Sequence, residues 1–170
     1  MGKRQFTMKL LETWDIDNIH KNYKELMKNI KWKGFKLSPP ADDDKKGYIL
    51  MEFNSGLEKE STKILIYRHR IQITYNNWKD LLLALVISNL LLKEDEKSPV
   101  SLILKNFKET GSLPQPLVRS SFEILRDQYL DLTEGKLSGD IKKYAKEILE
   151  TSLILMLEEV INVNDEEDQK

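Results

Sequence analysis

The chain has 170 residues, of which 40% are hydrophobic and 32% charged, a size and composition typical of one soluble domain or two small ones. It contains no cysteine, which excludes disulfides, thiolate metal sites and cysteine nucleophiles. Its longest apolar stretch, residues 81–92, is shorter than the roughly 20 residues that span a bilayer, and residues 1–7 lack the apolar core of a signal peptide. We therefore expect a cytoplasmic protein without a membrane segment.

Charge is distributed unevenly along the chain. Residues 1–93 contain 17 Lys and Arg against 11 Asp and Glu, whereas residues 94–170 contain 10 against 17. The hydrophobic periodicity changes near the same point, so we expect an α/β-sheet module over residues 1–93, a helical region over 94–163 and an acidic tail over 164–170. A basic half that faces an anionic ligand would explain the asymmetry. Electrostatic matching between subunits, or scatter of charge over a solvated surface, would explain it equally.

The first half predicts a helix followed by a small antiparallel sheet. Apolar residues at helical spacing begin near Asp17, with Asp15 or Asp17 as the cap. Residues 32–37 and 48–53 predict strands, separated by a polar loop over 38–47 that contains two prolines and a glycine. Residues 63–75 are strongly β-like and form either one long bent strand or a hairpin that turns at Arg68 and His69. We favour the hairpin because strands are usually five or six residues long.

A long apolar helix is predicted next. Asn77 is suited to cap it and Asp80 to occupy its first turn, and residues 78–92 form the most apolar segment of the chain. We expect this helix to lie at the centre of the core. One face of the sheet packs on it.

Three further helices are predicted after residue 93. Ser98 and Pro99 begin the first and Gly111 ends it. Pro114 and Pro116 open the second, and the third covers about residues 139–162. The fold class is therefore α+β, with an N-terminal helix and an antiparallel sheet of three or four strands packed on an apolar helix, followed by a C-terminal three-helix region.

The last predicted helix is more apolar than a single amphipathic stripe requires. Leu153, Leu155 and Met156 lie in its most apolar part. This excess indicates either a deep position within the chain or a surface for a protein partner or a second copy. We name these three residues as the candidate partner-binding site.

Motifs of known catalytic sites are missing from the sequence. There is no Walker loop, dinucleotide glycine fingerprint, H-E-x-x-H or G-x-S-x-G. The two histidines, His20 and His69, belong to different predicted elements, and the acidic runs lack the spacing of a calcium loop. We expect no cofactor, no metal and no catalytic activity. An enzyme with a dispersed carboxylate site, using residues such as Asp15, Asp17 or Glu52, remains the alternative.

Basic and aromatic residues gather in two segments of the first half. The candidates for nucleic-acid binding are Lys31, Trp32, Lys33, Lys36, Arg68 and Arg70. Cationic side chains neutralise phosphates, and aromatic rings stack on unpaired bases, which favours a single strand. If the strand runs through residues 63–75, alternation places Arg68 and Arg70 opposite Tyr67. In the competing interpretation, Tyr67 belongs to an inner face with Leu65, Ile71, Ile73 and Tyr75, and the cations only keep the outer face soluble.

These observations favour a non-catalytic binding or accessory protein of nucleic-acid metabolism. Its basic half would contact nucleic acid, and its helical half would contact a protein partner or a second copy. The alternative is a purely structural interaction subunit or homo-oligomer with no nucleic-acid contact.

Overall fold

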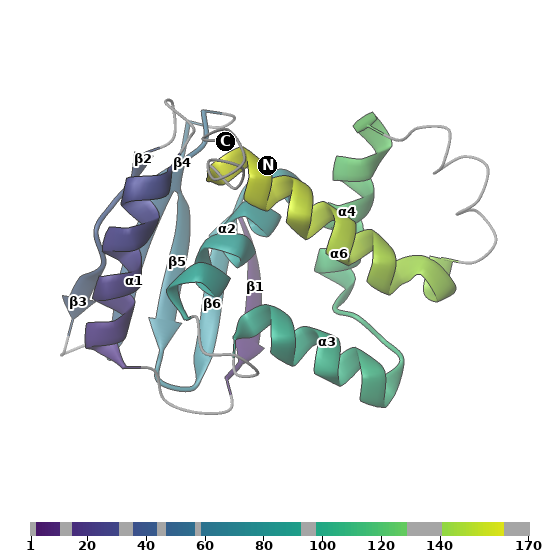
Figure 1. Cartoon of the computed structure of the whole chain (residues 1–170), viewed down its shortest axis with the longest axis horizontal. Helices are drawn as coiled ribbons and strands as arrows, with labels where there is room; N and C mark the ends of the chain where they lie inside the picture. The colour runs from purple at the N-terminus through teal and green to yellow at the C-terminus, as the bar shows by residue number, and fades with distance from the viewer. Residues whose placement is uncertain are drawn as a thin grey trace, which may run out of the picture.

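The computed structural model describes residues 3–10, 15–30, 36–43, 47–56, 59–92, 98–128 and 141–161. These residues form an antiparallel sheet followed by helices, so the α+β class is confirmed (Figure 1). The strands are β1 (Arg4–Lys9), β2 (Lys36–Leu37), β3 (Ala41–Asp43), β4 (Tyr48–Asn54), β5 (Thr62–Tyr67) and β6 (Arg70–Tyr75). The helices are α1 (Ile16–Asn29), α2 (Trp78–Leu91), α3 (Pro99–Thr110), α4 (Gln115–Gln128) and α6 (Ile141–Val160).

The sheet has six strands, more than the three or four that the sequence predicts. Their order is β1-β6-β5-β4-β2, and β3 also pairs with β4. The sequence did not predict β1. This strand precedes α1 and pairs with β6, the last of the described strands along the chain, so no neighbouring segment indicates the pairing. The prediction lacks β3 because that strand is three residues long and lies inside the segment predicted as a polar loop.

The segment 63–75 is a hairpin. β5 ends at Tyr67 and β6 begins at Arg70, so Arg68 and His69 form the turn. The pairs Ile64↔Ile73 and Ile66↔Ile71 set its register. All four isoleucines are fully buried, and a slip by one residue would move them to the exposed face. The predicted hairpin is therefore confirmed, and the single long strand is not formed.

Helix α2 is the centre of the core, as predicted. Every residue from Asp80 to Ser88 is buried, so the helix has neighbours on all sides. It packs across β5 and β6 and contacts α1, α3, α4 and α6. Figure 1 shows α1 and α2 side by side in front of the sheet. Within the described part of the chain, no helix is long and apolar enough to cross a membrane.

The helix ends follow the predicted capping chemistry. Asp15 Oδ1 accepts the Asp17 N–H at 3.0 Å, and Asn77 Oδ1 accepts the Asp80 N–H at 2.9 Å. Gly111 ends α3 with a φ of 75°, a conformation that glycine adopts without steric cost. Side chains thus satisfy N–H groups that a helix start leaves without an intrahelical partner.

One buried core includes residues from both sides of residue 93, from Phe6 on β1 to Val160 on α6. Asn89 of α2 links the two parts directly, because its Oδ1 accepts the Val100 N–H in the first turn of α3. Ile30 and Ile161 form an isolated antiparallel bridge beyond the ends of α1 and α6. The helices that follow α2 therefore complete the core that α2 shares with the sheet.

Buried serines lie where α4 and α6 pack together. Ser121 and Ser152 are fully buried, and each hydroxyl donates to a carbonyl one turn earlier in its own helix, at 2.8 Å. The Ser152 hydroxyl also lies 3.4 Å from the Ser121 carbonyl oxygen. Small side chains allow the helices to approach closely, and the back-bonded hydroxyls leave neither serine unsatisfied.

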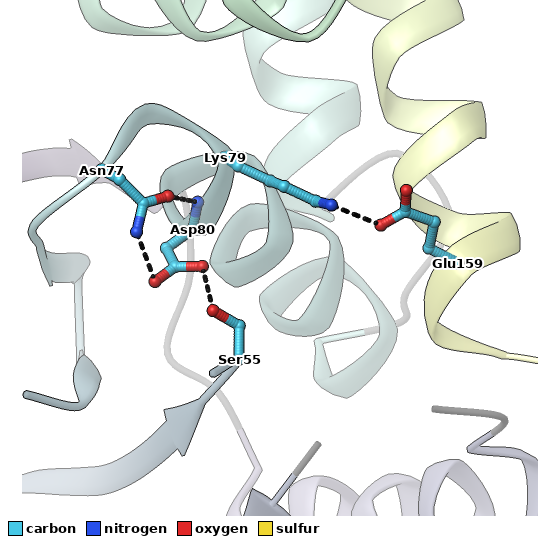
Figure 2. A network of polar contacts seen from close by, with 5 residues as sticks. All are labelled: Ser55, Asn77, Lys79, Asp80 and Glu159. Carbon is cyan, nitrogen blue, oxygen red and sulfur yellow. Dashed lines mark hydrogen bonds and ion pairs between the residues drawn. The ribbon is translucent and has the colours of Figure 1, made fainter. Parts of the chain in front are cut away.

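The start of α2 is tied to the sheet through one buried carboxylate, that of Asp80 (Figure 2). Asp80 is 3% exposed. Its Oδ1 accepts the Ser55 hydroxyl at 2.8 Å, and its Oδ2 accepts the Thr62 hydroxyl at 3.2 Å and the Asn77 amide at 3.0 Å. Ser55 follows β4 and Thr62 begins β5, so this carboxylate fixes both strand ends against the helix.

We expect Asp80→Ala to lower the free energy of unfolding by about 2–4 kcal/mol, because it removes the acceptor of two buried hydroxyls and of the partly buried Asn77 amide. Asp17→Ala is the matched control, since Asp17 is an exposed acid in the first turn of α1 and contributes about 1 kcal/mol or less. Urea unfolding followed by circular dichroism measures both. Equal losses in the two variants would show that the Asp80 network adds nothing to ordinary helix-end electrostatics.

Tyr23 ties α1 to the sheet edge. Its hydroxyl donates to the Leu37 carbonyl of β2 at 2.9 Å. Burial raises the pKa of the Tyr23 phenol above its ordinary value of 10.0. In the unfolded chain the phenol therefore ionises first as the pH rises. The contribution of this group to stability is complete below pH 10.0 and falls as the pH rises toward the higher folded value.

We expect Tyr23→Phe to be less stable than wild type by about 1 kcal/mol at pH 8, where the hydrogen bond is intact. At pH 11 the difference should be smaller, because only wild type loses stability through this phenol. Urea titrations at the two pH values test this. A difference that stays constant with pH would contradict it.

Candidate nucleic-acid interface on the open sheet face

The two faces of the sheet have different environments. Alternate residues of β4, β5 and β6 are buried under the helices, and the residues between them are not. We call the second set, with its neighbours on β1, the open face; all of its side chains are partly or fully exposed, so no described element covers it. It consists of Gln5, Thr7, Lys9, Tyr48, Leu50, Glu52, Asn54, Lys63, Leu65, Tyr67, Arg70, Gln72 and Thr74.

Aromatic and cationic side chains form one row across this face. Tyr48 pairs with Tyr67 in the β4–β5 register, and Arg70 pairs with Lys9 in the β6–β1 register. The two tyrosine rings meet edge to face, with centroids 5.2 Å apart and an interplanar angle of 77°. The Arg70 guanidinium lies 4.1 Å from the centroid of the Tyr67 ring. We call Tyr48, Tyr67, Arg70 and Lys9 the aromatic–cation row.

The two-residue turn explains why Tyr67 belongs to this row. In a continuous strand, alternation would place Tyr67 opposite Arg70. The turn at Arg68 and His69 changes the alternation, so Tyr67 and Arg70 lie on the same face. The interpretation that placed Leu65 and Tyr67 on the inner face of the sheet is therefore wrong, because both are partly exposed. Ile64 and Ile66 of the same strand are buried instead.

Positive charge is concentrated at the turn end of the face. Glu52 is paired with Lys63 in the register, which balances this carboxylate. Asp43 of β3 pairs with Tyr48 at the far end of the row from Lys9. Across the described strands, Lys9 and Arg70 pair with each other and not with an acid, and exposed Arg68 in the adjacent turn adds a further cation. A low-dielectric sheet surface with cations at one end attracts anions there.

The structure places the sequence-predicted nucleic-acid residues unevenly. Arg68 and Arg70 are exposed and close together at the turn end. Lys36 is exposed but pairs with Asn54 at the other end of β4, away from the row. Lys31, Trp32 and Lys33 lie outside the described residues.

Sequence reasoning missed Tyr48 and Lys9. Tyr48 opens a strand of strict alternation, so its exposed position follows from the pattern once Ile49, Met51 and Phe53 are taken as core. Lys9 had no comparable signal, because its place in the row depends on the pairing of β1 with β6.

The candidate partner residues on α6 are mostly interior. Met156 is 1% and Leu153 8% exposed, and both belong to the buried core, while Leu155 is half-buried. The neighbouring Ile154 is 56% exposed. The apolar excess of this helix therefore packs largely within the chain. This agrees with the first of the two interpretations of its sequence, a deep position within the chain.

The candidate carboxylates do not converge. Asp15 caps α1, Asp17 lies in its first turn, and Glu52 is on the open face beside Lys63. Among the described residues, no group of three or more histidine and acidic side chains is placed to hold a metal ion. His69 contributes its backbone, since its carbonyl accepts the Leu10 N–H.

We expect Arg70→Ala to lower the free energy of unfolding by about 0.5–1 kcal/mol, because it removes the cation–π contact with Tyr67. Arg68→Ala deletes the same charge from the adjacent turn and should change stability by less than about 0.5 kcal/mol. Thermal and urea unfolding of the two variants provide the comparison. If both variants match wild type, the guanidinium over Tyr67 makes no energetic contact.

Comparisons with known proteins found no matching family model, no similar curated protein and no similar solved structure. A function is therefore inferred from the chain itself. The feature with the clearest chemistry is the aromatic–cation row on the open face.

Proposed function

We propose that the protein binds single-stranded nucleic acid on its open face, as a non-catalytic binding or accessory protein. Unpaired bases stack on the ring of Tyr48 and on the platform of Tyr67 and Arg70. Lys9 and Arg68 contact the backbone phosphates next to these stacked bases. The same chemistry serves other sheet surfaces that bind single strands, where aromatic stacking is combined with a cationic track.

The placement of Tyr67 beside Arg70 carries this proposal. An exposed cation alone is typical of any soluble sheet surface, and a strand tyrosine is most often part of the core. Here, the guanidinium lies 4.1 Å from the ring on a face that no described element covers. Planar groups for stacking and charges for phosphate are thus adjacent.

A single strand fits this surface better than a duplex. The row crosses four neighbouring strands, so its rings and cations line a sheet surface and do not project from it as a helix or ribbon would. A duplex keeps its base faces stacked inside, where the tyrosines do not reach them, and its major groove takes a protruding helix or ribbon. Single-stranded bases are free to lie on the rings.

The test is a fluorescence anisotropy titration of labelled oligo(dT), oligo(U) and a DNA duplex, each about 15 nucleotides long, at several salt concentrations. We expect a single strand to bind more tightly than the duplex. Tyr67→Leu should weaken binding about tenfold with an unchanged salt slope, because stacking releases no counterions. Lys9→Ala combined with Arg70→Ala should weaken binding and reduce the slope by about 0.7 for each phosphate that is no longer neutralised.

The matched control is Lys24→Ala combined with Lys28→Ala, which deletes two exposed cations from α1. This variant should keep wild-type affinity for the single strand. Absence of binding at low salt contradicts the proposal, as would equal weakening by the two double variants. The structural interaction subunit would then be the better interpretation.

A further inference from the structure

Strand β1 leaves one of its two edges unpaired within the described part of the chain. It is the terminal strand of the sheet and pairs only with β6. The Leu10 N–H donates to the His69 carbonyl, so the backbone groups of Leu10 point toward the β6 side. Because this direction alternates along an antiparallel strand, the N–H and C=O groups of Gln5, Thr7 and Lys9 point away from the sheet.

These outward groups are accessible. Gln5, Thr7 and Lys9 are all exposed, and no hydrogen bond from a described residue reaches their outward backbone groups. A row of unpaired donors and acceptors on an edge strand is a template for another extended segment.

A cleft of about 630 Å³ opens where this strand ends, between β1 and α3. Its apolar lining consists of Met8, Leu10, Leu102, Ile103 and Pro114. Helix α3 extends away from the sheet at this end (Figure 1), and only Pro99 and Ile103 of its side chains are buried. The volume lies in the range of known ligand pockets, and it adjoins the open edge directly.

Charge identifies the kind of segment that fits. Residues 3–9 contain Lys3, Arg4 and Lys9 and no acid. Lys3 forms an ion pair with Glu60 at 3.2 Å, so the positive charge nearest the cleft comes from Lys9 and Lys105, and Glu109 is the one acidic lining residue. Pairing of β1 with β1 of a second copy would bring two cationic strands together, which is unfavourable. An acidic strand is attracted to the same edge.

We propose that the β1 edge and the β1–α3 cleft form a docking site for an extended acidic segment of another protein. The segment adds to the sheet as a strand beside β1, hydrogen-bonded to the backbone of Gln5, Thr7 and Lys9. One bulky apolar side chain of the segment enters the cleft beside Leu102, and its carboxylates lie near Lys9 and Lys105. This site is separate from the aromatic–cation row except for Lys9, so it does not depend on nucleic-acid binding.

The experiment selects binders of the full chain from a displayed library of random ten-residue peptides and measures the recovered peptides by fluorescence anisotropy. We expect apolar and acidic residues to alternate in them. Thr7→Pro should weaken binding at least tenfold, because it deletes an outward N–H without removing a β1–β6 hydrogen bond. Thr7→Val is the matched control and should bind as wild type does.

Leu102→Asp and Lys105→Glu keep the test decisive if Thr7→Pro disturbs the fold. Both positions lie on α3 outside the buried core, and each change should weaken the acidic peptides at least fivefold. Hydrogen exchange by NMR should show slower exchange of the Gln5, Thr7 and Lys9 amides in the complex. Recovery of no binders, peptides without acidic enrichment, or binding indifferent to all three variants would overturn the proposal.

Discussion

The apolar character of α2 is the constraint on which the rest of the structure depends. A helix that is hydrophobic on every side is stable in water only when other elements surround it. In this chain the sheet covers one side, α1 another, and α3, α4 and α6 the remainder. Polar side chains fix both ends of the helix. Asp80 holds its first turn to β4 and β5, Asn89 holds its last turns to α3, and Asn22 of α1 donates to the Leu91 carbonyl.

The bare face of the sheet follows from the same constraint. Because the helices are used to enclose α2, they gather on the side of the sheet where it lies, and none of the described elements remains to cover the other side. An antiparallel sheet tolerates this arrangement because its strands alternate between apolar and polar side chains. The open face is thus a direct result of how the core is built.

The sequence predicted those features that depend on local chemistry. The caps at Asp15 and Asn77, the end of α3 at Gly111 and the central position of α2 all follow from residue types within one or two turns. It did not predict β1, since strand pairing with β6 depends on contacts between distant segments. The row of Tyr48, Tyr67, Arg70 and Lys9 was only partly visible. The place of Tyr67 beside Arg70 depends on the two-residue turn, and the place of Lys9 depends on the pairing of β1 with β6.

The turn at Arg68 and His69 has a further consequence for how this surface could change during evolution. The isoleucines buried on the other face of β5 and β6 hold the register of the hairpin, and with it the placement of Tyr67 beside Arg70. A longer turn that keeps Ile66 opposite Ile71 would therefore leave these two side chains together on the open face. The surface chemistry is inherited with the core, so changes of loop length at Arg68 and His69 are tolerated better than changes of the isoleucines.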